Sequence, residues 1–251
     1  MQDAVISHLN HNELMSCVEK CIHKGSSFAQ PSIFLFHQNG KAFAYKTFSQ
    51  KFSLARLLWG AVSLKKEFKV LKKLLPVSGV PKVYYFVSNF GYVMEYLEAE
   101  RIPRRRFVSS AAQPEREKII EISSEEKSNL SPEFFDKAMN ILIEIHKRGV
   151  AHCDIRRNNI LVGRGETPIF IDFATAFVRN EGSNFIRQKI FNYLCKVDRI
   201  TLVKIKASYF PGSITKDEKI LISSVPFYLR FGRFLRQKIY RPLKKIFKKR
   251  K

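Results

Sequence analysis

The sequence lacks any apolar run that approaches the ~18–20 residues of a membrane-spanning helix. It begins MQDAVISHLNHNEL, without the basic and apolar segments of a secretory signal, so we expect neither export nor a membrane span. Cysteine is scarce, with four in 251 residues, which excludes a disulfide scaffold and favours a reducing, cytoplasmic compartment. Cys17 and Cys21 have no partner ligands at metal-site spacing, so we expect two buried thiols.

Acidic residues are also few, and the excess positive charge is concentrated at the C-terminal end. Lys and Arg number 45 against 22 Asp and Glu, and +13 of the +23 net charge falls in the last 51 residues. Residues 226–251 hold eleven cations and no acid, with apolar residues at near-helical spacing. Such a tail suits an anionic membrane surface, where each cation contributes about 1 kcal/mol. Docking on the rest of the protein stays open, and nucleic-acid contact is less favoured.

The first half of the chain is predicted to be rich in strands. Residues 1–50 are typical of strands throughout. The pair Asn39-Gly40 is a strong hairpin signal and should join strands at 31–36 and 41–48. Side-chain alternation along the second of these strands gives Lys46 a definite face.

A helix is predicted over residues 53–75, where apolar residues recur at helical spacing. Glu67 lies beside this stripe, and Pro76 ends the helix. Two further strands are predicted at 83–87 and 92–96. The apolar stripe consists of Leu57, Leu64, Phe68, Leu71 and Leu75.

The second half is predicted to be mainly helical. Residues 99–130 combine a basic cluster, a Ser/Ala/Pro stretch and an acidic stretch, which is typical of a flexible connection or insertion. A helix should then begin after an N-cap at Ser131, with Pro132 in its first turn, and end at Gly149. A further helical pattern occupies 183–207.

The stretch 151–162, AHCDIRRNNILV, carries the most chemical information. Asp154 follows His152 by two residues and precedes Asn159 by five. Asp172 lies thirteen residues beyond Asn159, and apolar residues flank every polar group. Such anchors hold a side chain rigidly, as a catalytic group requires. Carboxylate and amide oxygens are also ligands that suit Mg²⁺.

Together with Lys46 and Glu67, these residues resemble the protein-kinase-like superfamily. The motif H-x-D-x-x-x-x-N is present at 152–159, and Asp172-Phe173-Ala174 stands where the superfamily has D-F-G. The resemblance covers roughly residues 17–200 in the expected order. It implies an α+β fold of two lobes, with a strand-rich N-lobe and a reduced helical C-lobe.

The resemblance also divides the chain. It implies an N-lobe over 1–98 with a hinge at 94–98, a flexible connection or insertion over 99–130, a C-lobe over 131–225 and a basic amphipathic tail over 226–251.

The same resemblance implies how ATP would be held. Lys46 would bind the α- and β-phosphates and pair with Glu67. The hinge backbone from Glu95 to Leu97 would bind adenine, with Met94 as gatekeeper. The phosphate loop would be Lys24-Gly25-Ser26-Ser27, although the chain has no G-x-G-x-x-G.

The resemblance gives the remaining polar residues catalytic roles. Asp154 would orient the acceptor hydroxyl and take its proton, and Arg156 would contact the phosphate in transfer. Asn159 and Asp172 would hold Mg²⁺. Phosphoryl transfer depends mainly on positioning and charge neutralisation, and this set would supply both.

Several departures point away from conventional protein kinases. Cys153 replaces the Arg that usually precedes the catalytic Asp, so activation-loop phosphorylation is not expected to be the switch. Ala174 replaces the Gly of D-F-G, which should restrict backbone flips. No A-P-E motif follows, and 79 residues remain after Asp172. The chain is more similar to small atypical bacterial kinases, namely the lipopolysaccharide core Kdo and heptose kinases and the RIO-type protein kinases.

Three functions remain open from the sequence. The first expectation is transfer of the ATP γ-phosphate to a sugar of a lipid-linked glycan, at the cytoplasmic face of the inner membrane. The second is transfer to a protein Ser or Thr hydroxyl, as in RIO-type kinases. The third is a kinase-fold binding module without activity. The intact catalytic set argues against this third function, and the glycine-poor loop argues for it.

Overall fold

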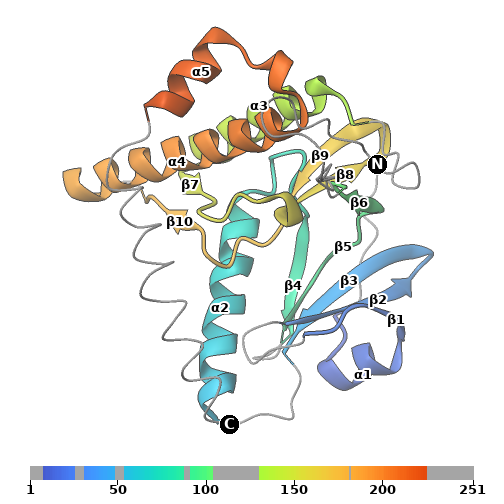
Figure 1. The fold of residues 1–251 in the computed structure, drawn as a ribbon. Coiled ribbons are helices and arrows are strands. Elements are labelled where there is room, and N and C mark those ends of the chain that lie inside the picture. Colours follow the sequence, from blue (N-terminus) through green and yellow to red (C-terminus); the bar gives the residue numbers. More distant parts are fainter. Residues whose placement is uncertain are drawn as a thin grey trace, which may run out of the picture.

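The computed structural model describes residues 8–25, 31–48, 54–87, 91–103, 130–180 and 182–224. A five-stranded antiparallel sheet comes first along the chain and helices follow, so the predicted α+β, kinase-like fold is confirmed (Figure 1). The predicted tail, Ser26 and Ser27 of the predicted phosphate loop, and most of the predicted connection lie outside the described residues.

The N-terminal sheet has the strand order β1-β2-β3-β5-β4. The predicted hairpin joins β2 to β3 and is confirmed, with Gln38 paired to Lys41. Asn39 and Gly40 have φ values of 52° and 72°, as a two-residue turn between twisted strands requires. The strands are β1 (Val18–His23), β2 (Ser32–Gln38), β3 (Lys41–Thr47), β4 (Val83–Val87) and β5 (Gly91–Glu95).

One face of the sheet packs on helix α1 (His11–Ser16), which the sequence analysis wrongly assigned to strands. Leu14 is buried there in one apolar cluster with Tyr45. The missed signal is a capping box, because the Asn10 side chain accepts the Glu13 N–H and the Glu13 carboxylate accepts the Asn10 N–H.

The expectation of buried thiols at Cys17 and Cys21 is wrong, because both are exposed. Cys17 caps the C-terminal end of α1. Cys21 lies on β1, the outermost strand of the sheet, whose central side chains all face solvent.

The opposite face of the sheet packs on the long helix α2 (Leu54–Lys73), close to the predicted bounds. Its buried side includes Leu64, Val70 and Leu71. Glu67 is 2% exposed and therefore lies within this buried stripe rather than beside it. Leu75 was predicted to belong to the stripe but is 39% exposed, because the helix has ended before it.

The remaining strands form two small sheets, β6-β8-β9 and β7-β10, between the N-terminal sheet and the later helices (Figure 1).

Helix α3 begins and ends where its predicted capping residues lie. The Ser131 side chain accepts the Phe134 N–H, Pro132 opens the helix, and Gly149 adopts φ 73° beyond its end. The elements are β6 (Ala99–Arg101), α3 (Pro132–Lys147), β7 (Val150–Ala151), η1 (Arg157–Asn159), β8 (Ile160–Gly163), η2 (Arg164–Glu166), β9 (Thr167–Phe170), β10 (Phe177–Val178), α4 (Phe185–Tyr209), η3 (Pro211–Ser213) and α5 (Lys216–Ser223).

Helix α4 lies where the helical pattern predicts it. Its buried side, however, does not include the first apolar residues of that pattern. Ile186 and Ile190 are 68% and 44% exposed. The buried side instead begins at Phe191 and continues through Cys195 to an acidic residue, Asp198. The first turns of α4 therefore extend beyond the core, and a charged group lies inside it.

A buried lysine joins three helices in the described second half of the chain. Lys206 on α4 donates to Asp136 of α3 at 2.6 Å and to Glu218 of α5 at 3.0 Å. Burial lowers the pKa of Lys206, but these hydrogen bonds outweigh burial and leave the pKa above its ordinary value. The ammonium therefore stays charged and fixes α5, a helix that the sequence analysis did not predict.

Within the described ranges, no helix combines the length and the apolar character needed to cross a membrane.

The pairing of β3 with β5 predicts a sensitive position at Gly91. A Cβ added there would lie 2.2 Å from the Lys46 carbonyl oxygen, so the two strands must separate. We expect Gly91→Ala to lower the free energy of unfolding by about 1–3 kcal/mol in urea titrations. Gly212→Ala is the matched control, because nothing lies within 4 Å of its added Cβ, and it should change little. Equal midpoints for the two variants would contradict this strand contact.

Candidate active site

A cavity of about 460 Å³ lies between the N-terminal sheet and the second half of the chain. Ile33 and Ala44 line it from β2 and β3, and Leu161 lines it from β8. Most of the residues selected from the sequence meet in this cavity. They are Lys46, Glu67, Glu95, Leu97, Arg156, Asn159 and Asp172.

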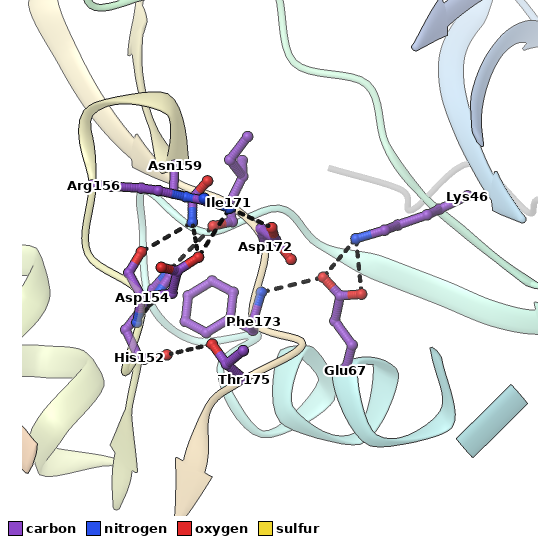
Figure 2. A network of polar contacts seen from close by, with 10 residues as sticks. All are labelled: Lys46, Glu67, His152, Asp154, Arg156, Asn159, Ile171, Asp172, Phe173 and Thr175. Carbon is purple, nitrogen blue, oxygen red and sulfur yellow. Dashed lines mark hydrogen bonds and ion pairs between the residues drawn. The ribbon is translucent and has the colours of Figure 1, made fainter. Parts of the chain in front are cut away.

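A buried ion pair forms one wall of the cavity. The Lys46 Nζ on β3 donates to both carboxylate oxygens of Glu67 on α2, each at 2.8 Å (Figure 2). Glu67 Oε1 also accepts the Phe173 N–H at 3.2 Å. This carboxylate therefore connects the sheet, the helix and the segment that follows Asp172.

The loop at 152–159 and Asp172 form a second polar group, from which Arg156, Asn159 and Asp172 line the cavity and Asp154 does not. Asn159 donates from Nδ2 to the Asp154 carbonyl and to Asp154 Oδ2, both at 2.9 Å. Arg156 Nη2 lies 3.0 Å from Asp154 Oδ2 and 3.7 Å from Asp172 Oδ2 (Figure 2). One guanidinium thus neutralises two carboxylates. Among the described residues, the Asn159 amide oxygen accepts no hydrogen bond and is left for another partner.

His152 supports this loop as a neutral group. Its Nδ1 accepts the Asp154 N–H at 3.3 Å, so the proton must be on Nε2, which donates to the Ile171 carbonyl at 3.1 Å. The ring is fully buried, with its centroid 4.6 Å from that of Phe173. Burial lowers the pKa of His152, in agreement with the neutral form. A structural rather than basic role fits these contacts.

Asp198 is a functional residue that the sequence analysis missed. It accepts the backbone N–H of His152 at 2.7 Å and that of Cys153 at 3.0 Å, and it contacts His146 Nε2 at 3.2 Å. Cys153 has φ 65°, a left-handed conformation that is costly for a residue with a side chain. Asp198 therefore holds the loop in a shape that it would not adopt alone. The sequence signal that could have identified Asp198 is an acidic residue at helical spacing from the apolar residues of α4.

Asp172 also has a left-handed backbone, with φ 67°. The preceding Ile171 N–H donates to the Asn159 carbonyl at 3.0 Å, and Phe173 is held by Glu67. Both sides of Asp172 are thus fixed, which directs its carboxylate toward Arg156.

Residues of the predicted hinge line the cavity, whereas Gly25 of the predicted phosphate loop does not. Glu95 and Leu97 of the predicted hinge line the cavity. The Glu95 N–H is already used, because it donates to Lys82 O at 2.8 Å. Gly25 does not line the cavity, and its N–H donates to Ser32 Oγ at 3.1 Å. The β1 residues Ile22 and His23 line the cavity instead.

The donor set fits Mg²⁺ bound together with phosphates. The described part of the chain contains no group of three or more His, Cys, Asp or Glu that could hold a metal alone. Mg²⁺ usually takes one or two protein oxygens and completes its shell with water and substrate phosphates. The oxygens of Asn159 and Asp172 match that need.

Comparison with known proteins identifies one family. Residues 36–192 match the family model of the RIO domain. No curated protein gives a match. The matched segment covers more than half of the chain and includes Lys46, Glu67, the catalytic loop and Asp172.

Asp198 should be needed for the stability of the catalytic loop. Asp198→Asn keeps one acceptor oxygen but loses the charge and the second oxygen. We expect it to lower the free energy of unfolding by about 1.5–3 kcal/mol, measured in urea. Asp217→Asn, an exposed change on α5, serves as control and should stay within about 0.5 kcal/mol. If both variants match the wild type, Asp198 does not support the loop.

His152 predicts a pH dependence of stability. Its pKa in the folded protein lies below 6.5, so the unfolded chain takes up the proton first as the pH falls. The wild type should therefore lose stability below pH 6.5 more steeply than His152→Gln, while the difference between them stays constant above pH 7. Urea midpoints at a series of pH values test this, and parallel curves would show that His152 does not contribute.

Proposed function

The chain belongs to the RIO-domain family, an atypical branch of the protein-kinase-like superfamily, and on this basis we propose that it is an ATP-dependent phosphotransferase. The proposed acceptor is a protein Ser or Thr hydroxyl. The observation that carries the proposal is the meeting of the Lys46–Glu67 pair with Asn159 and Asp172 around one cavity. Asp154 does not line this cavity and joins the group through its contacts with Asn159 and Arg156. The domain division predicted from the sequence is part of the proposal, with ATP between the two lobes.

The apolar part of the cavity suits adenine. Ile33 and Ala44 would lie over one face of the purine, and Leu161 and Ile171 under the other. Polar atoms of the backbone from Glu95 to Leu97 would bind its edge. Lys46 would then reach the α- and β-phosphates as a buried cation.

The polar part of the cavity suits the transfer. The chemistry that Mg²⁺ would supply here is neutralisation of the charge on the phosphates. Asp172 and the Asn159 amide oxygen would hold the ion, because the Asn159 N–H groups are already used on Asp154.

Asp154 would orient the acceptor hydroxyl and accept its proton, since its carboxylate is fixed by Asn159 and partly exposed. Arg156 is long, exposed and bound to both carboxylates, so it would move to the phosphate in transfer and stabilise its charge.

The family match favours a protein acceptor over the lipid-linked sugar that we expected first. A lipopolysaccharide sugar has no support from it, and the tail on which the membrane expectation rests lies outside the described residues. The catalytic set is complete and its members contact one another, which supports an enzyme rather than a binding module.

Replacing Asp154 separates catalysis from nucleotide binding. Asp154→Asn keeps an oxygen for Arg156 but cannot take a proton, so phosphate transfer should fall about 10²–10⁴-fold. Mg·ATP affinity by calorimetry should stay close to that of the wild type. Transfer of label from ATP would be measured with a dephosphorylated casein mixture and with a membrane lipid extract, and Asp217→Asn is the control. Wild-type rates in Asp154→Asn would contradict the catalytic role, and label only in the lipid would contradict the protein acceptor.

A further inference from the structure

Tyr92 on β5 places a buried hydroxyl beside the Lys46–Glu67 pair, and the mechanism above does not use it. The side chain is fully buried, and its ring packs near Phe68 and Phe86. Within the described part of the chain the hydroxyl has no hydrogen-bond partner, although Tyr92 lines the cavity. A buried hydroxyl without a partner is costly, because it loses its hydrogen bonds to water. Such a group suggests a partner in another state of the protein.

The position of Tyr92 is set by the strand register. Tyr92 pairs directly with Lys46 across β3 and β5, so both side chains lie on the sheet face that α2 covers. Burial raises the pKa of Tyr92 well above its ordinary value, and the negative charge of Glu67 together with the approach of the hydroxyl to this carboxylate raises it further. The hydroxyl therefore stays protonated and is a hydrogen-bond donor.

The two oxygens of Glu67 are not equally supported. Oε1 accepts from Lys46 Nζ at 2.8 Å and from the Phe173 N–H at 3.2 Å. Among the described residues, Oε2 has one donor, Lys46 Nζ at 2.8 Å. If Lys46 turns two of its three N–H groups to phosphate oxygens, Oε2 loses that donor inside the protein.

We propose that Tyr92 is a positioning residue whose hydroxyl donates to Glu67 once Lys46 engages the phosphates of a bound nucleotide. The carboxylate then stays ionised and in place, and it continues to hold Phe173 and the segment that carries Asp172. This inference rests on the proposed function, because it requires a ligand with phosphates in the cavity. In the free protein the hydroxyl lies near the Glu67 carboxylate without a well-formed hydrogen bond, and its main contribution is made in the complex.

Tyr92→Phe tests this role, because it removes the hydroxyl and keeps the ring. Calorimetry on the full chain would measure the affinities for Mg·ADP and for adenosine, which has no phosphate. Mg·ADP should bind about tenfold more weakly to the variant, because Oε2 is left without a donor. Adenosine affinity should not change. The urea midpoint of the free protein should be unchanged or higher, because an unpartnered hydroxyl is lost.

Tyr85→Phe is the matched control on the neighbouring strand. The Tyr85 hydroxyl accepts the Leu9 N–H at 3.2 Å and belongs to the apolar cluster on the opposite face of the sheet. Its removal should lower the urea midpoint of the free protein and leave both ligand affinities as they are. Tyr92→Phe should therefore change the affinity for Mg·ADP but not lower the urea midpoint, and Tyr85→Phe should lower the urea midpoint but not change the affinity.

Three results would overturn the inference. Wild-type affinity of Tyr92→Phe for Mg·ADP would mean that the hydroxyl does not assist Glu67. Equal weakening for Mg·ADP and adenosine, with a lower urea midpoint, would mean that the hydroxyl has only a structural role. If the wild type binds neither ligand, the proposed function fails first and this inference fails with it.

Discussion

A buried ammonium and a buried carboxylate can both remain charged only if each is held at hydrogen-bond distance by the other. Lys46 lies on a strand and Glu67 on the helix that covers it. They meet this condition through two hydrogen bonds of 2.8 Å. Loss of either partner would leave an uncompensated charge, at a cost of about 3–5 kcal/mol. The pair therefore fixes the distance between the sheet and α2 more strictly than apolar packing would. Because Glu67 also accepts the Phe173 N–H, the same constraint reaches the segment that carries Asp172.

A second anchor acts from the opposite side. Asp198 holds the backbone at His152 and Cys153, including a left-handed residue that local preference would not maintain. The two anchors meet through Phe173, whose backbone is bound to Glu67 and whose ring packs on His152. His152 in turn accepts the Asp154 N–H. The positions of the two carboxylates that face Arg156 thus depend on a continuous set of buried contacts from β3 to α4.

The features that the sequence predicts well are those that depend on neighbouring residues. The Asn39-Gly40 turn needs two left-handed positions, and the start of α3 needs Ser131 and a following proline, so local chemistry is sufficient. The capping box of α1 was an equally local signal and could have been found. The buried side of α4 could not be predicted in this way. The backbone partners of Asp198 lie 45 and 46 residues away in the sequence, and only tertiary packing brings them together. The contact of Gly25, from the predicted phosphate loop, could not be foreseen for the same reason, because its N–H is bound to Ser32 on the next strand.

The segment that matches the RIO domain ends at residue 192, before either buried charge of α4. Asp198 supports the loop at 152–159, and Lys206 ties α4 to Asp136 of α3 and to Glu218 of α5. The residues that we propose as catalytic are therefore inside the family segment, while groups that hold them in place are outside it. A helix that carries such an anchor must itself be fixed, and the ion pairs of Lys206 supply this through α3 and α5. The part of the chain that can maintain the site thus extends at least to Glu218, well past the segment by which the family is identified.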